Sequence, residues 1–220
     1  MNRLELDRVW AAVDAQRTAL CDLLDDLTDD EWRHPSLCEG WTVRDVAAHL
    51  TMQQLGPLAA FGVILHWRGS MDRTVAHVSR RRAAQPTDRL VARIRGMVGS
   101  RRHTVGVTPL ESLADALIHS QDIAVPLGRR LDLPPAAAAT AATRLLTMRM
   151  PPPLPSVRKV AGFRLTATDV EWSTGTGPEV RGPMGALLLV IAGRPAALPQ
   201  LTGPGAASLA ARFETPPLLR

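Results

Sequence analysis

The chain is poor in aromatic residues and cysteine: its 220 residues include no tyrosine, three phenylalanines and two cysteines. With so few rings, we expect no surface on which the bases of a single-stranded nucleic acid could stack. Two cysteines, Cys21 and Cys38, are too few for a disulfide scaffold. No apolar run reaches the roughly 18 residues that would span a bilayer. The start of the chain, MNRLELDRVW, carries charges where a signal peptide needs an apolar stretch, so we expect a cytoplasmic protein.

Basic residues outnumber acidic ones by 26 to 21, and all of them except Lys159 are arginines. Arginines gather at 79–85, SRRRAAQ, and at 100–103, SRRH. Such clusters can attract nucleic acid or an anionic small molecule, but a solvated rim on a basic protein is the commoner reason for them. A role in nucleic-acid binding predicts a steep dependence on salt, and we rank it last.

Apolar residues recur at three- and four-residue steps through much of the first 150 residues, which indicates amphipathic helices. The predicted helices cover 2–27, a segment from Thr42 towards Trp67 with a bend near Gly56 and Pro57, 87–98, a segment from Pro109 to just before Pro126, and 135–150. Helices joined by loops of this length favour an antiparallel bundle.

The pattern changes at the proline-rich stretch PPPLPS, residues 151–156. Beyond it, apolar residues alternate in AGFRLTATDVEWSTGTG (161–177), which indicates strands with a glycine-rich turn. GPMGALLLVIAGRP (182–195) predicts a short buried helix, and GPGAASLAARF (203–213) a terminal one. We therefore predict a mainly α protein with two domains, a helical bundle at 1–150 and a small α/β domain at 151–220.

Two histidines interrupt apolar helix faces. His49 stands in DVAAHL, while Asp115 and His119 are four residues apart and so lie one turn apart on one face of a helix. An acidic residue four positions before a histidine can clamp a transition metal, and a bundle can bring His49 opposite this pair. Two imidazoles and a carboxylate would leave one tetrahedral position open, as at a catalytic zinc site. Taken singly, a histidine such as His49 on an apolar helix face is more often a hydrogen-bonded core residue than a metal ligand. For Asp115 and His119 alone, an ordinary hydrogen bond on the helix surface is at least as common as a shared metal.

The remaining candidates carry weaker signals. Cys38 precedes the predicted helix start at Thr42, and His49 lies roughly 10 Å further along that helix. We therefore expect Cys38 to be too far from the site to be a ligand or a nucleophile, and to serve as a small apolar side chain in a tight loop. The other histidines have no ligand spacing and are expected on the surface or in loops.

Two segments together carry a family resemblance. PSLCEGWTVRDVAAHL (35–50) and ALIHSQDIAVPLG (116–128) resemble the DinB-like superfamily of metal-binding four-helix bundles, more narrowly its actinobacterial branch typified by mycothiol-dependent maleylpyruvate isomerase. In that branch the first histidine stands in an AHL motif, and the second opens an H-x-x-D segment. The stretch from Gly162 to Pro195 is similar to the small α/β domain of the same branch. The resemblance implies an antiparallel four-helix bundle in which His49, Asp115 and His119 bind a metal.

The resemblance also implies roles for two further residues. Asp122 matches the aspartate three residues after the last ligand, where it could hold a ligand or the substrate in place. Arg194 is implied as a carboxylate-binding group, although an arginine near a helix C-terminus also offsets the helix dipole. The isomerase type has glutamate where this chain has Asp115. The shorter side chain could shift the helix, draw the metal towards it, or weaken the affinity.

A metal with one open position can ionise a coordinating thiol. The resemblance implies zinc as the metal and mycothiol as the thiol, in an S-transferase or isomerase that acts on a small electrophile. The alternative is a non-catalytic metal- or small-molecule-binding protein. We expect a small-molecule thiol and its electrophilic substrate as partners, and no membrane or nucleic acid. A homodimer stays an option, because such bundles often pair through apolar faces.

Overall fold

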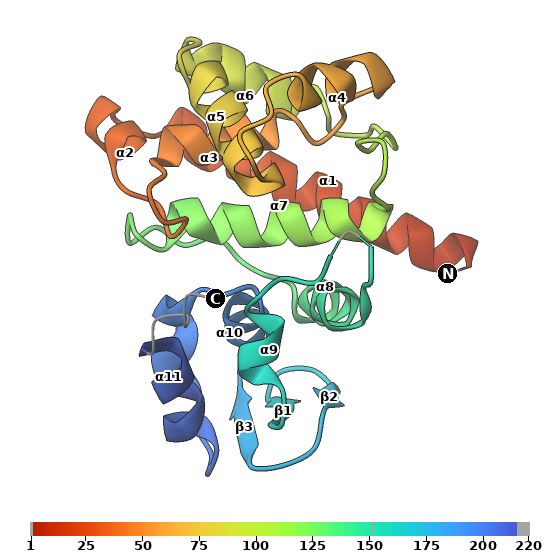
Figure 1. Ribbon diagram of the computed structural model, residues 1–220, viewed down its shortest axis with the longest axis vertical. Coiled ribbons are helices and arrows are strands. Elements are labelled where there is room, and N and C mark those ends of the chain that lie inside the picture. The colour runs from red at the N-terminus through yellow and green to blue at the C-terminus, as the bar shows by residue number, and fades with distance from the viewer. Residues whose placement is uncertain (1, 151, 215–220) are drawn as a thin grey trace. The chain divides into compact units, whose positions relative to one another are not determined.

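The computed structural model describes residues 2–150 and 152–214. Contacts within the chain group it into two compact units, residues 1–132 and 133–220. The first unit is built from helices, and the second contains a small three-stranded sheet with helices around it (Figure 1). This architecture confirms the expected mainly α fold with a smaller α/β part. In the described residues, no helix is both long and apolar enough to cross a membrane.

Seven α-helices form the described part of the first unit: α1 (Arg3–Asp25), α2 (Asp29–Arg33), α3 (Val43–Leu50), α4 (Pro57–Ile64), α5 (Met71–Ala83), α6 (Thr87–Arg95) and α7 (Pro109–Ala124). The long helix α1 runs along α7, and α3 packs on both α5 and α7 (Figure 1). Five of these helices, α1, α2, α3, α6 and α7, contribute to one apolar core, with Leu24, Leu50, Ile94 and Ile123 among its members. The helical bundle expected from the sequence is thus confirmed.

Local sequence explains where the helices that carry the site begin. Thr42 caps α3, and the Asp45 carboxylate accepts the Thr42 amide at 2.9 Å, so a capping box with aspartate as its acid is present. Thr108 and Glu111 form the same arrangement at the start of α7, where Pro109 occupies the first turn. Both helices therefore have a fixed first turn, which sets the rotation of every side chain that follows.

Two expectations about this unit are wrong. The helix predicted from Thr42 towards Trp67 is not one bent helix but two, because α3 ends at Leu50 and Pro57 opens α4 as its first residue. Helix α5 was not expected at all. Two of its three buried residues, Thr74 and Ser79, are polar, so its sequence shows little apolar periodicity.

The second unit contains α8 (Pro135–Thr147), α9 (Val157–Val160), β1 (Arg164–Ala167), β2 (Ser173–Thr174), β3 (Glu179–Gly182), α10 (Met184–Ile191), the 3-10 helix η1 (Pro195–Gln200) and α11 (Ala206–Glu214). Strand β1 lies in the middle of the sheet, antiparallel to β2 and parallel to β3. The strands predicted in 161–177 are β1 and β2, whereas β3 lies beyond that range. The buried helix α10 and the terminal helix α11 lie where the sequence predicted them.

Helix α8 packs on α10 in the second unit. Its buried face consists of Ala138, Ala141, Ala142 and Leu145. Small alanine side chains allow a close approach to the apolar α10, whose residues are almost all buried. The contacts therefore divide the chain before α8, whereas the domains predicted from the sequence, 1–150 and 151–220, divide after it.

The shared core of the first unit gives a test of stability. Ile123 is completely buried among α1, α3 and α6, so Ile123→Ala should lower the free energy of unfolding by about 2–5 kcal/mol. Ile64→Ala makes the same chemical change on α4, where the side chain is 51% exposed, and should cost no more than about 0.5 kcal/mol. Chemical denaturation of both variants measures the difference, and equal losses would contradict this assignment of the core.

Candidate metal centre

Helix α3 carries His49 in its last turn. Its neighbours Val46, Ala47, Ala48 and Leu50 are all buried, and the His49 side chain itself is only 18% exposed. The indole of Trp41 meets the imidazole edge-on, with ring centroids 5.7 Å apart. The Nδ1 atom of His49 is buried and has no hydrogen-bond partner among the described residues, while Nε2 lies 3.6 Å from Asp115 Oδ2.

Helix α7 presents Asp115 and His119 one turn apart, as the spacing predicted. His119 Nε2 lies 3.7 Å from Asp115 Oδ1, and the two imidazole centroids are 4.8 Å apart. One potential donor atom from each of His49, Asp115 and His119 lies within 4.8 Å of the other two. The Asp115 side chain is 42% exposed, so the cluster is open to solvent on one side. The structure thus brings together the three residues that the sequence singled out.

A buried carboxylate holds the far side of the His119 ring. Asp122 is completely buried, and its Oδ2 lies 2.8 Å from His119 Nδ1, which donates the hydrogen bond. The opposite ring nitrogen, Nε2, faces Asp115. An imidazole held in this way keeps a fixed orientation, which is how carboxylates commonly support a histidine ligand.

Cys38 lies in this cluster, so the expectation that it is too far away is wrong. Its thiol donates to Asp122 Oδ2 at 3.0 Å, and Sγ lies 3.8 Å from His119 Nδ1. The loop before α3 folds back, since Pro35 pairs with Thr42 and the Leu37 amide donates to the Asp122 carbonyl at 3.1 Å. A distance along α3 therefore says nothing about Cys38. The thiol contacts the Nδ1 side of His119, behind the ring.

The charges of the cluster depend on one another. Desolvation favours a raised pKa for Asp115, but a hydrogen bond to His49 and the charge of His119 lower it to about 2. Desolvation favours a lowered pKa for His119, but hydrogen bonds to Asp122 and Cys38 and the charge of Asp115 raise it to about 10. Without a metal, His119 is therefore a cation between two carboxylates at neutral pH.

A buried arginine lies next to this cluster and was missed from the sequence. Arg17 of α1 is 2% exposed and donates to Gln53 Oε1 at 3.1 and 3.3 Å and to the Met97 carbonyl at 3.1 Å. Burial lowers the pKa of Arg17, while the carboxylates of Asp14 and Asp115 act to raise it. Gln53 in turn contributes a hydrogen bond that lowers the pKa of Asp115. The signal was available, because Arg17 falls within the apolar stripe of α1, four residues after the buried Val13.

Arg194 lies in the second unit, directly before η1, and its guanidinium donates to the Ala192 carbonyl. Its expected role towards a substrate carboxylate stays a prediction. Its bond to the Ala192 carbonyl fits the alternative interpretation, an arginine near the C-terminal end of an apolar helix, here α10.

Residues 13–109 match the family model described as the mycothiol maleylpyruvate isomerase N-terminal domain. The matched range includes His49 and ends where α7 begins. No curated protein matches the chain.

Two solved structures resemble most of the chain. A crystal structure of the mycothiol-dependent maleylpyruvate isomerase is 15% identical, with a TM-score of 0.58, over 88% of this chain and 92% of that one. A histidine-to-alanine mutant of the mycothiol-dependent maleylpyruvate isomerase is 14% identical, with a TM-score of 0.60, over 94% and 97%. At these identities the two structures establish a shared fold. The resemblance to the mycothiol-dependent maleylpyruvate isomerase branch that the sequence indicates is thus confirmed, by the family match over residues 13–109 and by the shared fold.

Proposed function

We propose that this protein is a metal-dependent enzyme that uses mycothiol, an S-transferase or an isomerase, with His49, Asp115 and His119 as the metal ligands. One observation carries the proposal. Two imidazole nitrogens and a carboxylate from α3 and α7 meet within 4.8 Å of one another, on the solvent-exposed side of a histidine that a buried carboxylate orients. Two further findings support it, the match to the isomerase N-terminal domain family and the fold shared with that isomerase.

The donor set fits a divalent metal. Zinc takes nitrogen ligands at about 2.0–2.1 Å and carboxylate oxygens at about 2.0–2.2 Å, so two ligands of one tetrahedral ion are separated by about 3.3 Å. The two separations between Asp115 oxygens and imidazole nitrogens, 3.6 and 3.7 Å, are already close to that value. Borderline nitrogen ligands together with one carboxylate suit zinc better than magnesium or calcium, which prefer oxygen.

The residues around the ligands have separable tasks. Asp122 holds the Nδ1 proton of His119, so that Nε2 faces the open side. Cys38 donates to the same carboxylate and occupies the space behind the ring. Arg17 and Gln53 supply buried positive charge and hydrogen bonds near Asp115. When bound, the metal would lower the pKa of a coordinating thiol and so supply a thiolate nucleophile. Arg194 is proposed to bind a carboxylate of the electrophilic substrate.

Metal content tests the ligand set directly. Protein purified without chelators should carry about one divalent ion per chain, and His49→Ala and His119→Ala should each lose it, because each removes one of three ligands. His103→Ala removes an exposed histidine that stacks on Trp10 instead, and should keep the ion. Elemental mass spectrometry gives the stoichiometry of all four proteins.

A wild-type chain that takes up no zinc or other divalent ion would overturn the ligand assignment and leave a packed polar cluster. A chain that binds the ion but transfers no mycothiol to model electrophiles, and isomerises no substrate through it, would favour the alternative of a non-catalytic metal-binding protein.

The buried carboxylate gives a second prediction. In Asp122→Asn, the side-chain amide can turn its NH₂ group towards His119 Nδ1 and so favour the tautomer whose proton sits on Nε2. We expect metal affinity to fall by about 10- to 100-fold, measured by competition with a chromophoric chelator. Asp88→Asn, on the exposed surface of α6, should leave the affinity unchanged. An unaltered affinity in Asp122→Asn would show that this carboxylate does not orient the ligand.

The raised pKa of His119 predicts proton release. Because its pKa is about 10 in the metal-free protein, His119 carries a proton at neutral pH, and a ligating nitrogen must give that proton up. Zinc binding to chelator-treated protein should therefore release about one proton per ion near neutral pH. Calorimetry in buffers of different ionisation enthalpy counts the protons. Zinc uptake without proton release would contradict the charge state assigned to His119.

A further inference from the structure

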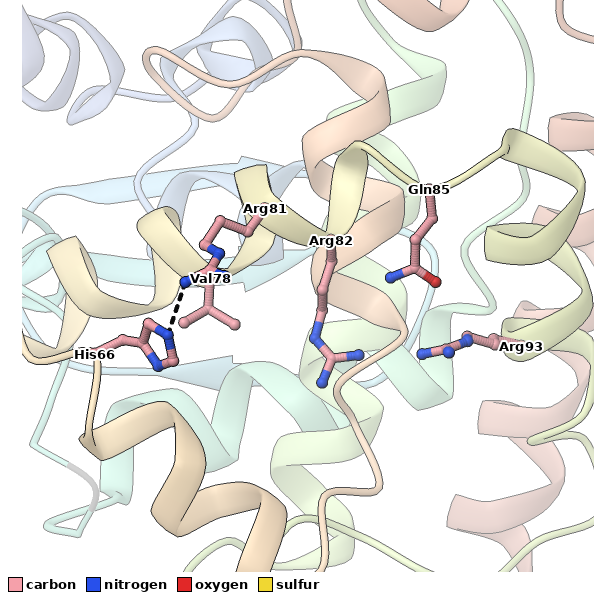
Figure 2. A pocket seen from close by; sticks show the side chains of 6 residues that line it. All are labelled: His66, Val78, Arg81, Arg82, Gln85 and Arg93. Carbon is pink, nitrogen blue, oxygen red and sulfur yellow. Dashed lines mark hydrogen bonds between the residues drawn. The ribbon is translucent and has the colours of Figure 1, made fainter.

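A pocket of about 410 Å³ lies in the first unit and shares no lining residue with the metal centre (Figure 2). It is lined by His66, Val78, Arg81, Arg82, Gln85 and Arg93. Most of these side chains come from α5 and α6, and Figure 2 shows Arg82, Gln85 and Arg93 pointing towards one another. Three guanidinium groups therefore line one small open space.

These arginines differ from others in the same unit. Arg95, two residues after Arg93 on α6, pairs with Asp25 at 2.6 Å, and Arg129 pairs with Glu31 at 2.9 Å. Within the part of the chain that the structure describes, no carboxylate forms an ion pair with Arg81, Arg82 or Arg93. The pocket thus collects positive charge that no side chain there neutralises.

Neighbouring contacts hold this charge in place. His66 Nδ1 lies 2.8 Å from the Gly62 carbonyl and must donate to it, so His66 Nε2 accepts the bond from Arg81 at 2.9 Å (Figure 2). His66 therefore accepts a hydrogen bond from Arg81 without bringing a negative charge into the pocket. Burial and the like charge of Arg93 lower the pKa of Arg82. An anion between these groups would relieve the repulsion.

We propose that this pocket binds the phosphate group of a small molecule. Guanidinium groups that come from separate positions on two helices suit a tetrahedral dianion, which offers oxygens in several directions, better than a planar carboxylate, which a single arginine fork can satisfy. The Gln85 amide adds a neutral hydrogen-bonding group to the lining. His66 is the one aromatic ring among the described residues that line the pocket, and its imidazole is already engaged by Arg81 and the Gly62 carbonyl. The pocket therefore lacks the Phe and Trp rings that serve as stacking platforms for nucleic-acid bases.

The inference does not rest on the metal centre, and its test keeps the two apart. Isothermal titration with inorganic phosphate and with glycerol 3-phosphate, at constant ionic strength, should show saturable binding of one ion per chain. Arg82→Gln and Arg93→Gln should each raise the dissociation constant for phosphate by about tenfold or more, because each removes a charge-assisted hydrogen bond. Arg89→Gln removes an exposed arginine of the same helix, α6, outside the pocket, and should bind as the wild type does. Metal content should stay the same in all four proteins.

Several results would overturn the proposal. One is the absence of saturable phosphate binding. Another is equal weakening in Arg89→Gln, which would indicate diffuse attraction by net charge. Succinate that binds as tightly as phosphate would show a carboxylate site. A single-stranded oligonucleotide that binds more tightly than glycerol 3-phosphate, and loses that binding in the same variants, would show a nucleic-acid surface.

Discussion

The buried carboxylate of Asp122 is the constraint on which the candidate centre depends. A carboxylate without solvent must be fully hydrogen-bonded, since leaving it unpaired in the interior costs several kcal/mol, to order of magnitude. The Asp122 carboxylate accepts hydrogen bonds from the His119 ring and the Cys38 thiol. The Asp122 backbone carbonyl accepts a hydrogen bond from the Leu37 amide. One residue of α7 thereby fixes both an imidazole on its own helix and the loop that leads into α3. Because that loop ends at the Thr42 cap, it also sets where α3 starts and where His49 lies.

The parts of the centre that could be predicted from sequence are those fixed by helix geometry. Asp115 and His119 are one turn apart in any helix, and His49 interrupts an apolar run that must face the core. The sequence predicts that the bundle places His49 opposite Asp115 and His119. The packing of α3 on α7 brings the three side chains together. The division into domains is harder to predict. The proline stretch at 151–156 is the stronger local signal and places the boundary after α8, whereas the packing of the alanine face of α8 on α10 places it before α8.

What escaped prediction depends on the path of a loop or on a partner far away in the chain. Cys38 reaches Asp122 because residues 34–42 turn back on themselves, and nothing in their spacing gives the direction of that turn. Arg17 is an ordinary surface residue by its type, although it stands in the apolar stripe of α1. Its burial is explained only by its hydrogen bonds to Gln53, which lies 36 residues later in the chain. Helix α5 was missed because its buried face includes hydroxyl groups, which apolar periodicity does not detect. In each case the missing information is a contact between distant segments.

Helix α3 connects the two polar sites of the helical unit. Arg44 donates to the carbonyl of Gln85, a residue that lines the arginine pocket, and His49 belongs to the donor cluster. Five residues separate the two, about 140° around the helix axis, so they project from different faces of one short helix. The carboxylates of Asp115 and Asp122 lie on the His49 side, and the arginines that line the pocket lie on the other. This separation keeps the guanidinium groups of the pocket from competing with a metal for Asp115.

The shorter acidic side chain at position 115 fits this packing. Where the isomerase type has glutamate, the Asp115 oxygens still lie 3.6 and 3.7 Å from the two imidazoles. In this packing of α3 and α7, the carboxylate that is one methylene shorter is within reach of both imidazoles. The small residues Ala47 and Ala48, next to His49 and fully buried, leave room for a close approach of the helices. Because fewer rotatable bonds link an aspartate to its backbone, less conformational entropy is lost when its carboxylate is held in one position.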